Sequence, residues 1–154
     1  MATRASDDVP MFEDQREIAA TMDGLDTVHR HLAEFWLRLE TDNRIAPDET
    51  WKVLFESAVA EVAGNIIRHA HPPSVFFMSL RAFPDRIESV LLDQGIPYQL
   101  VPVRPSADMR TALTEPDMDH GWGLAIAHAV TDGIVYSRLE SGHNRWVIEK
   151  NLPA

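Results

Sequence analysis

The stretch Glu61–Ala70, EVAGNIIRHA, decides the fold of this chain, because it sets polar side chains into an otherwise apolar helical pattern. A helix is predicted from about Glu49 to His69, and Pro72-Pro73 ends it. On a helical wheel at about 100° per residue, Asn65 falls inside the apolar arc and Glu61 falls at its edge, one turn earlier. The arc itself consists of Trp51, Leu54, Phe55, Ala58, Val59, Val62 and Ile66.

The side chains of Glu61 and Asn65 stack as an i, i+4 pair on this helix. Burying a carboxylate and an amide is costly unless each finds a partner, and a ligand or metal in a cavity can supply one. In the alternative, structural interpretation, Glu61 reaches the rim and Asn65 bonds neighbouring backbone; the helix alone leaves both open. Arg68 continues the edge that Glu61 marks, and His69 falls within the arc, where a satisfied core histidine is the simpler interpretation.

Outward from this helix, the patterns predict one domain over residues 15–152, preceded by a disordered tail over residues 1–14. The order of elements indicates an α/β (α+β) two-layer sandwich, with helices on one face of a mixed, mostly antiparallel sheet. The predicted elements are a strand at Gln15–Ala20, helices at Asp23–Leu39 and Leu124–Val130, a hairpin of Ser74–Ala82 and Arg86–Leu92, a long loop at Gln94–His120, and a final hairpin of Gly133–Glu140 and Arg145–Asn151.

Composition and charge exclude several classes of function. The 154 residues carry 24 acidic and 14 basic side chains, a net charge of -10, which argues against direct nucleic-acid binding. The chain has no cysteine, so a disulfide framework or a thiolate metal site is impossible. No stretch approaches the ~18 apolar residues of a membrane span, and the first residues lack an apolar signal region. We therefore expect a soluble, cytoplasmic protein that does not enter a membrane.

Two glycine-containing motifs follow the helix. Asp93-Gln94-Gly95-Ile96-Pro97 comes directly off a predicted strand, where an aspartate can accept a hydrogen bond from an exocyclic amine; an ordinary Asp-x-Gly turn is the alternative. Gly121-Trp122-Gly123-Leu124 precedes the third predicted helix, where backbone N–H groups can face an anion. A dinucleotide motif lacks its third glycine, because Ile126 holds that place, and no Gly-Lys-Ser/Thr of a P-loop occurs.

In this fixed order, the three motifs resemble those of the GHKL ATPase superfamily, which includes histidine-kinase catalytic domains, gyrase B and MutL. Glu61–Ala70 is similar to the N box, Asp93–Pro97 to the G1 box and Gly121–Leu124 to the G2 box. The resemblance implies a Bergerat ATP-binding fold over almost the whole chain. Because the N box reads Asn-x-x-x-His-Ala, the chain is most similar to the RsbW-type anti-sigma-factor serine/threonine protein kinases.

This resemblance implies an activity and partners. A protein of this type uses ATP and Mg²⁺ to phosphorylate a serine or threonine of an anti-anti-sigma (STAS-domain) protein, and it reversibly sequesters a sigma factor; a homodimer is expected. The alternative is a nucleotide-dependent protein-binding switch of the same fold with little or no kinase activity. A detached histidine-kinase catalytic domain ranks last, because His29 and His31 lack the flanking pattern of a phosphoacceptor histidine.

The resemblance also assigns roles to residues of the N box. Glu61 is the general base, acting on the acceptor hydroxyl or on water. Asn65 ligates Mg²⁺ through its amide oxygen. Arg68 neutralises phosphate charge, and His69 supports the site or contacts phosphate.

In the G1 box, the resemblance implies that Asp93 accepts the adenine amino group and that Gly95 lies beneath the ring, with Pro97 at the end of the motif. It also implies that a lid over residues 98–120 closes over the nucleotide and excludes water. The chain departs from many relatives at the last hairpin, where His143-Asn144 stands in place of Gly-Thr, and in its proline-rich, acidic lid. In the G2 box, the resemblance implies that Gly121 and Gly123 wrap the phosphates and that the dipole of the helix at Leu124 favours their negative charge. Trp122, between the two glycines, is expected to cover the nucleotide or to face a partner.

Overall fold

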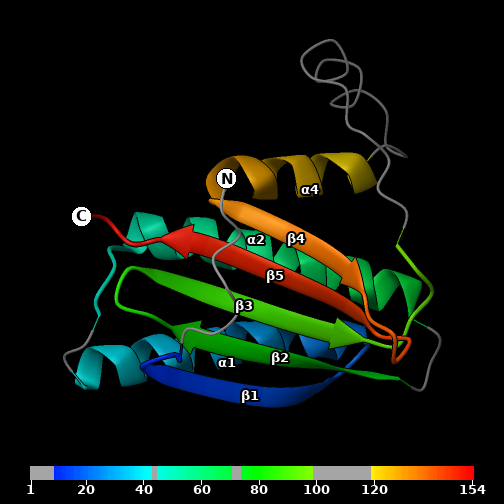
Figure 1. The fold of residues 1–154 in the computed structure, drawn as a ribbon, viewed down its shortest axis with the longest axis horizontal. Helices are drawn as coiled ribbons and strands as arrows, with labels where there is room; N and C mark the ends of the chain where they lie inside the picture. Colours follow the sequence, from blue (N-terminus) through cyan, green and yellow to red (C-terminus); the bar gives the residue numbers. More distant parts are fainter. Residues whose placement is uncertain (1–8, 43–44, 71–73, 99–118) are drawn as a thin grey trace, which may run out of the picture.

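The computed structural model describes residues 9–42, 45–70, 74–98 and 119–154, and within them three helices lie against a five-stranded sheet (Figure 1). This is the two-layer sandwich that the order of elements predicts. None of the described helices has the length and apolar character needed to cross a bilayer. In chain order the elements are β1 (Phe12–Ala19), α1 (Met22–Thr41), α2 (Glu49–His69), β2 (Val75–Ala82), β3 (Arg86–Asp93), α4 (Asp119–Val130), β4 (Gly133–Arg138) and β5 (Asn144–Asn151).

The strands lie in the order β1-β2-β3-β5-β4, and every neighbouring pair of described strands is antiparallel. The sheet expected to be mostly antiparallel is thus antiparallel throughout its described part. The final hairpin causes the one departure from sequence order, because β5 inserts between β3 and β4 and pairs with both. As a result, Asp93 at the end of β3 pairs with Asn144, the first residue of β5.

Strand β1 begins at Phe12, earlier than the predicted Gln15. Phe12 stacks on Phe35 of α1, with ring centroids 5.6 Å apart, which ties the start of the strand to the core. The expected tail is therefore wrong at Phe12–Asp14, which belong to the sheet, and its residues 1–8 lie outside the described residues. Burial alternates along this edge strand, but most of its residues are charged or polar, so the sequence shows no alternation of apolar and polar side chains that would predict its start.

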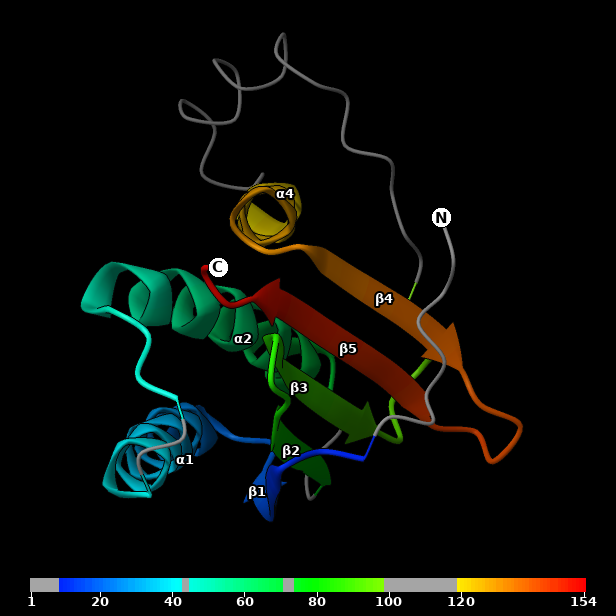
Figure 2. The same cartoon turned by 60° about the vertical axis from the view of Figure 1, so that its left-hand side comes forward.

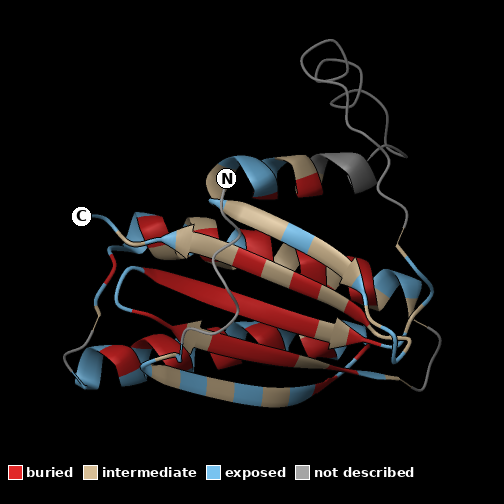
Figure 3. Cartoon of the chain, viewed as in Figure 1, coloured by how far each residue is buried: buried red, intermediate tan, exposed pale blue. Residues whose placement is uncertain are grey.

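The helices cover one face of the sheet, and the hydrophobic core lies between the two layers (Figures 2 and 3). In β2, the fully buried Phe76 and Met78 occupy alternate positions, as expected of a strand with one covered face. Helices α1 and α2 contribute aromatic side chains, and Trp36 lies edge-on to Trp51 and to Phe55, with centroids 5.9 Å from each. This packing joins α1 to α2, and α2 also contacts β3 and β5.

Helix α2 begins and ends where the sequence predicts, from Glu49 to His69. The side chain of Asp48 caps it by accepting a hydrogen bond from the Trp51 amide at 2.8 Å. Asn65 is 4% exposed, which confirms its position inside the apolar arc of the helical wheel. The helix therefore carries a polar side chain into the buried layer, where it needs a partner.

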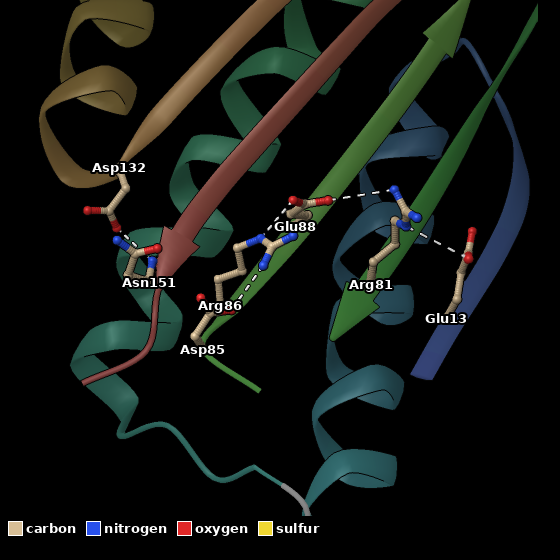
Figure 4. A network of polar contacts seen from close by, with 7 residues as sticks. All are labelled: Glu13, Arg81, Asp85, Arg86, Glu88, Asp132 and Asn151. Carbon is tan, nitrogen blue, oxygen red and sulfur yellow. Dashed lines mark hydrogen bonds and ion pairs between the residues drawn. The ribbon is translucent and has the colours of Figure 1, made fainter. Parts of the chain in front are cut away.

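A network of ion pairs lies at the end of the sheet where β3 begins (Figure 4). Arg86 Nε donates to Glu88 Oε1 at 3.0 Å, and Arg81 lies 3.6 Å from Glu88 and 3.8 Å from Glu13. Arg86 and Glu88 are 4% and 8% exposed, so their charges are largely desolvated and depend on one another. Because Asp93 stands at the opposite end of β3, we regard this network as structural.

Candidate functional site

A cavity of about 500 Å³ opens between the C-terminal half of α2, the end of β3 and the start of β5. This volume lies within the range of small-molecule sites. The cavity brings together residues of two predicted motifs, from α2 and from the segment after β3. Its lining residues are Asn65, Ile66, His69, Asp93, Gly95, Ile96, Pro97, Tyr98, Asn144 and Trp146.

A second cavity of about 520 Å³ adjoins the first and reaches the junction of β1 and α1. The two share Ile66, Asp93 and Gly95, so Asp93 borders both. Asn65 and His69 line only the first cavity. The first cavity is therefore the one that joins Asn65 and His69 of the α2 motif to the motif that follows β3.

Asn65 is a buried polar side chain in the wall of the first cavity. Its Oδ1 accepts a hydrogen bond from Arg68 Nη2, about one turn later on the helix. Its Nδ2 is buried and has no partner among the described residues. A half-satisfied buried amide is costly, so the side chain calls for a further partner inside the cavity. This arrangement favours the cavity interpretation of Asn65 over bonding to neighbouring backbone.

Glu61 lies one turn before Asn65, with its side chain 26% exposed. Its carboxylate rests against α4 at Gly123, where a Cβ atom would stand only 2.0 Å from the carboxylate carbon. Position 123 therefore requires glycine as long as the carboxylate stays in this place. Arg68 Nη2 lies 3.7 Å from Glu61 Oε1, so one guanidinium reaches both polar groups of the pair on α2.

The charge of Glu61 affects Tyr98, a residue of the cavity wall. Burial raises the pKa of Tyr98, the Glu61 carboxylate raises it further, and Arg68 acts in the opposite direction. The Tyr98 ring packs against Trp146 and Tyr136, with centroids 4.9 Å and 5.8 Å away. Glu61 and Arg68 do not line the cavity themselves, but their charges act on Tyr98, which does.

Asp93 ends β3 as a buried carboxylate, 8% exposed. Its Oδ1 accepts hydrogen bonds from the Gly95 amide at 2.8 Å and from Asn144 Nδ2 at 2.9 Å. A Cβ atom at Gly95 would fall 2.8 Å from the same oxygen, so a glycine is needed for this close approach. The Asp-x-Gly turn therefore forms part of the cavity wall. Both hydrogen bonds that Asp93 accepts from described residues end on Oδ1, which leaves Oδ2 for a ligand.

Helix α4 starts at Asp119, so the expectation that Gly121-Trp122-Gly123 precedes a helix starting at Leu124 is wrong. In a helix with this start, the Gly121 amide is among the unpaired donors of the first turn, whereas the Gly123 amide pairs inside the helix. Leu124 is 6% exposed and packs in the hydrophobic core. Of the lid predicted over residues 98–120, residues 99–118 lie outside the described part of the chain, as does the Trp122 side chain, whereas Asp119 and His120 belong to α4.

Arg68 and His69 of the α2 motif are exposed at the end of the helix beside the cavity. His69 lines the cavity but is exposed, so a buried core position for it is wrong. Arg68 is also exposed at this end of the helix, with 40% of its side chain accessible. Both stand in the last turn, where the helix dipole favours positive charge.

The last hairpin contributes residues that sequence reasoning did not assign to the site. Asn144 is 3% exposed and contacts Asp93 directly, and Trp146 follows it on the same face of β5. Their alternation along β5 was a readable signal for a shared face. The insertion of β5 beside β3, which brings that face to Asp93, cannot be read from a local pattern.

Comparison with known proteins gives one family and one fold. A family model described as "Histidine kinase-like ATPase domain" matches residues 18–148. The crystal structure of the RsbU and RsbW domains of Rv1364c from Mycobacterium tuberculosis is similar, with a TM-score of 0.61 and 16% sequence identity. The match covers 94% of this chain and 34% of that one, so this chain spans about a third of its length. No curated protein matches the chain.

Proposed function

Because the chain belongs to the histidine kinase-like ATPase domain family, we propose that its cavity binds Mg·ATP and that the protein is a serine/threonine protein kinase of the RsbW type. Its acceptor is an anti-anti-sigma (STAS-domain) partner, and in a second role it sequesters a sigma factor in the cytoplasm, acting as a homodimer. The observation that carries the proposal is that Asn65 of α2 lines the same cavity as Asp93 and Gly95.

The geometry supports roles for individual residues in nucleotide binding. Asp93 Oδ2 accepts the amino group of adenine, and Gly95 leaves room for the ring. Asn65 suits a magnesium ligand because its amide oxygen already accepts from a cationic group, the Arg68 guanidinium. Its buried Nδ2, which has no partner among the described residues, would donate to a phosphate oxygen. Bound magnesium neutralises phosphate charge, and Arg68 and His69 at the rim add positive or donor groups.

Phosphoryl transfer needs little more than positioning and one base. Glu61 accepts the proton of the acceptor hydroxyl. At the same time the hydroxyl oxygen forms a bond to the γ-phosphorus, and the bond between the γ-phosphorus and the leaving oxygen of ADP breaks. Arg68, which lies 3.7 Å from Glu61, is placed to offset the negative charge that gathers between the carboxylate and the phosphates.

One observation favours the second candidate, a nucleotide-dependent binding switch with little or no transfer. Arg68 contacts both Glu61 and the Asn65 oxygen, so a single guanidinium engages the two groups that the kinase reaction needs. In a switch, nucleotide binding rearranges these contacts and changes affinity for the partner protein, and no phosphate moves.

Labelled ATP separates the two candidates. The protein is incubated with γ-³²P-ATP, Mg²⁺ and the STAS-domain protein encoded nearest to it, and ATP binding is measured in parallel by calorimetry. We expect Glu61→Gln to keep ATP binding and to lose transfer by about 100-fold or more. Asp93→Asn lowers ATP affinity by roughly tenfold or more, the size of one hydrogen bond to a charged group.

Glu49→Gln is the matched control, because Glu49 starts the same helix with its side chain 86% exposed. It should change neither quantity. ATP binding without transfer by the unmodified protein would replace the kinase with the switch. A folded protein that binds no ATP would overturn both.

A further inference from the structure

We propose that Asn144 is a positioning residue that holds the Asp93–Tyr98 segment in its nucleobase-binding shape without itself binding the nucleotide. This inference rests on the proposed nucleotide site and names a residue that lies outside the N, G1 and G2 boxes. Asn144 belongs to the last hairpin, at the place where the sequence departs from the Gly-Thr of many relatives.

The sheet register puts Asn144 between two other strands. It pairs with Asp93 at the end of β3 on one side and with Arg138 at the end of β4 on the other. The side chain is 3% exposed and lines the cavity. Asn144 is therefore a fixed point that connects the segment after β3 to the final hairpin.

The amide of Asn144 is fully used inside the protein. Its Nδ2 donates to Asp93 Oδ1 at 2.9 Å and to the Ile96 carbonyl at 2.9 Å, with the Gly95 carbonyl at 3.4 Å. Its Oδ1 accepts from Tyr136 Oη at 2.5 Å and from Arg138 Nη1 at 3.0 Å. A carboxamide has two N–H donors and two acceptor positions. No donor or acceptor of Asn144 is left over for a ligand.

The two partners of the Asn144 oxygen, Tyr136 and Arg138, also bind the segment after β3. Arg138 Nη1 also donates to the Gly95 carbonyl at 2.7 Å, and Tyr136 Oη accepts from the Tyr98 amide at 2.9 Å. We call Asn144, Tyr136 and Arg138 the hairpin clamp. The segment after β3 forms no strand or helix, so its backbone polar groups take these side chains as partners in place of a sheet or helix ladder.

The clamp determines how Asp93 meets a ligand. Because Asn144 and the Gly95 amide both bind Oδ1, the carboxylate cannot rotate freely, and Oδ2 keeps one direction in the cavity. An acceptor held in place before binding spares the ligand the cost of ordering it. Loss of the clamp should therefore weaken nucleotide affinity much more than the rate of the bound complex, since the polar contacts of Glu61 and Asn65 among the described residues go to Arg68 and not to the clamp.

The test compares Asn144→Ser with Asn151→Ser, which makes the same change at the exposed far end of β5. We expect Asn144→Ser to raise the Kd for Mg·ATP by about tenfold or more. Turnover at saturating ATP should change by less than about twofold, as for a residue that acts only on binding. A general folding defect would instead lower the active fraction and leave Kd unchanged. Asn151→Ser should alter neither Kd nor turnover.

Hydrogen exchange provides a readout that needs no nucleotide. The Gly95 and Tyr98 amides should exchange faster in Asn144→Ser than in Asn151→Ser, because each donates to an atom that Asn144 holds. If Asn144→Ser does not fold, Tyr136→Phe carries the test, with faster exchange at Tyr98 and a Kd raised by about threefold.

Unchanged exchange at both amides, or an unchanged Kd in a folded variant, would overturn the positioning role. Failure of the unmodified protein to bind ATP would instead overturn the proposed function. In that case hydrogen exchange alone decides whether Asn144 orders the segment.

Discussion

The carboxylate of Glu61 fills the space that a side chain at position 123 would need. In Gly123→Ala the new Cβ would fall 2.0 Å from the carboxylate carbon, so the glutamate must swing away from α4. We expect phosphoryl transfer at saturating ATP to fall about 10- to 100-fold, because a shift of about 1 Å in a catalytic group can cost this much. ATP affinity should fall less than the rate.

Gly133→Ala is the control for this substitution. A Cβ at Gly133 meets nothing within 4 Å, so transfer and affinity should both stay as they are. A Gly123→Ala protein with full transfer activity would show that Glu61 does not act from the place it occupies beside α4.

Individual residues were predictable where helical phase fixes them. The periodicity of α2 was enough to place Asn65 in the buried layer and Glu61 at its edge, because every position on a helix follows from its neighbours. The prediction of a buried position was wrong for His69, because it is the last residue of the helix and its side chain is exposed at the rim of the cavity. The contact of Asn144 with Asp93 depends on a strand pairing that joins distant residues, and the sequence carries no local signal for it.

At the level of elements, the junction between β1 and α1 leaves no room at Gly24. A Cβ on this first-turn residue would lie 2.0 Å from the Ala19 carbonyl oxygen, which is backbone and cannot turn away. Gly24→Ala must therefore separate α1 from β1, and we expect a loss of about 1–3 kcal/mol in the free energy of unfolding. Urea denaturation measures it.

The same substitution in α2 should have the opposite sign. At Gly64, the nearest atom to a new Cβ is Arg68 Nη1 at 3.9 Å, an ordinary contact. Alanine restricts the unfolded chain and favours the helix, so Gly64→Ala should gain roughly 0.5–1 kcal/mol. Equal effects of the two substitutions would contradict the packing described for the β1–α1 junction.

The contact between α1 and β1 also predicts a pH dependence. His31 is fully buried, and its Nε2 lies 3.2 Å from Asp14 Oδ2. Burial, and then Arg16, lowers the pKa of His31 below 6.5, whereas Asp14 and Glu34 act in the opposite direction. Because the unfolded chain binds the proton more readily, the stability from this site is complete above pH 6.5 and is lost as the pH falls toward the lower folded value.

Urea midpoints between about pH 7.5 and about pH 5.5 test this dependence. We expect His31→Gln to flatten the decline across this window. His29→Gln, on the exposed side of the same helix, should retain it. An equally steep decline in both variants would assign the effect to other groups.

The ends of helices and strands were predictable where the sequence carries a capping residue or a proline that marks them. Helix α2 has an aspartate cap before it and two prolines after it, and its predicted ends hold. Strand β1 starts within charged residues and α4 starts before its glycines, so neither start has a sequence marker. The antiparallel sheet followed from the two hairpins, but the position of β5 between β3 and β4 is a property of the packed sheet.

At the scale of the whole molecule, the cavity joins the helical layer to the sheet, so a ligand there should stabilise the entire fold. With Mg·ATP at about 100 times its Kd, the gain is about 2.7 kcal/mol. For a chain of this size we expect a rise in Tm of roughly 5–10 °C by scanning calorimetry. EDTA, or Asn65→Ala in the presence of Mg²⁺, should remove the magnesium-dependent part. A Tm that Mg·ATP leaves unchanged would contradict the placement of the site.

Trp146 in the cavity wall gives the chain an optical probe of its own. The indole is 3% exposed and packs edge-on against Tyr98, so a bound nucleotide base would quench or shift its emission. Trp36 and Trp51 pack together in the core between α1 and α2 and supply a constant background. Replacing these two and Trp122 with phenylalanine leaves Trp146 as the sole indole, whose fluorescence then follows the filling of the cavity in real time and without label.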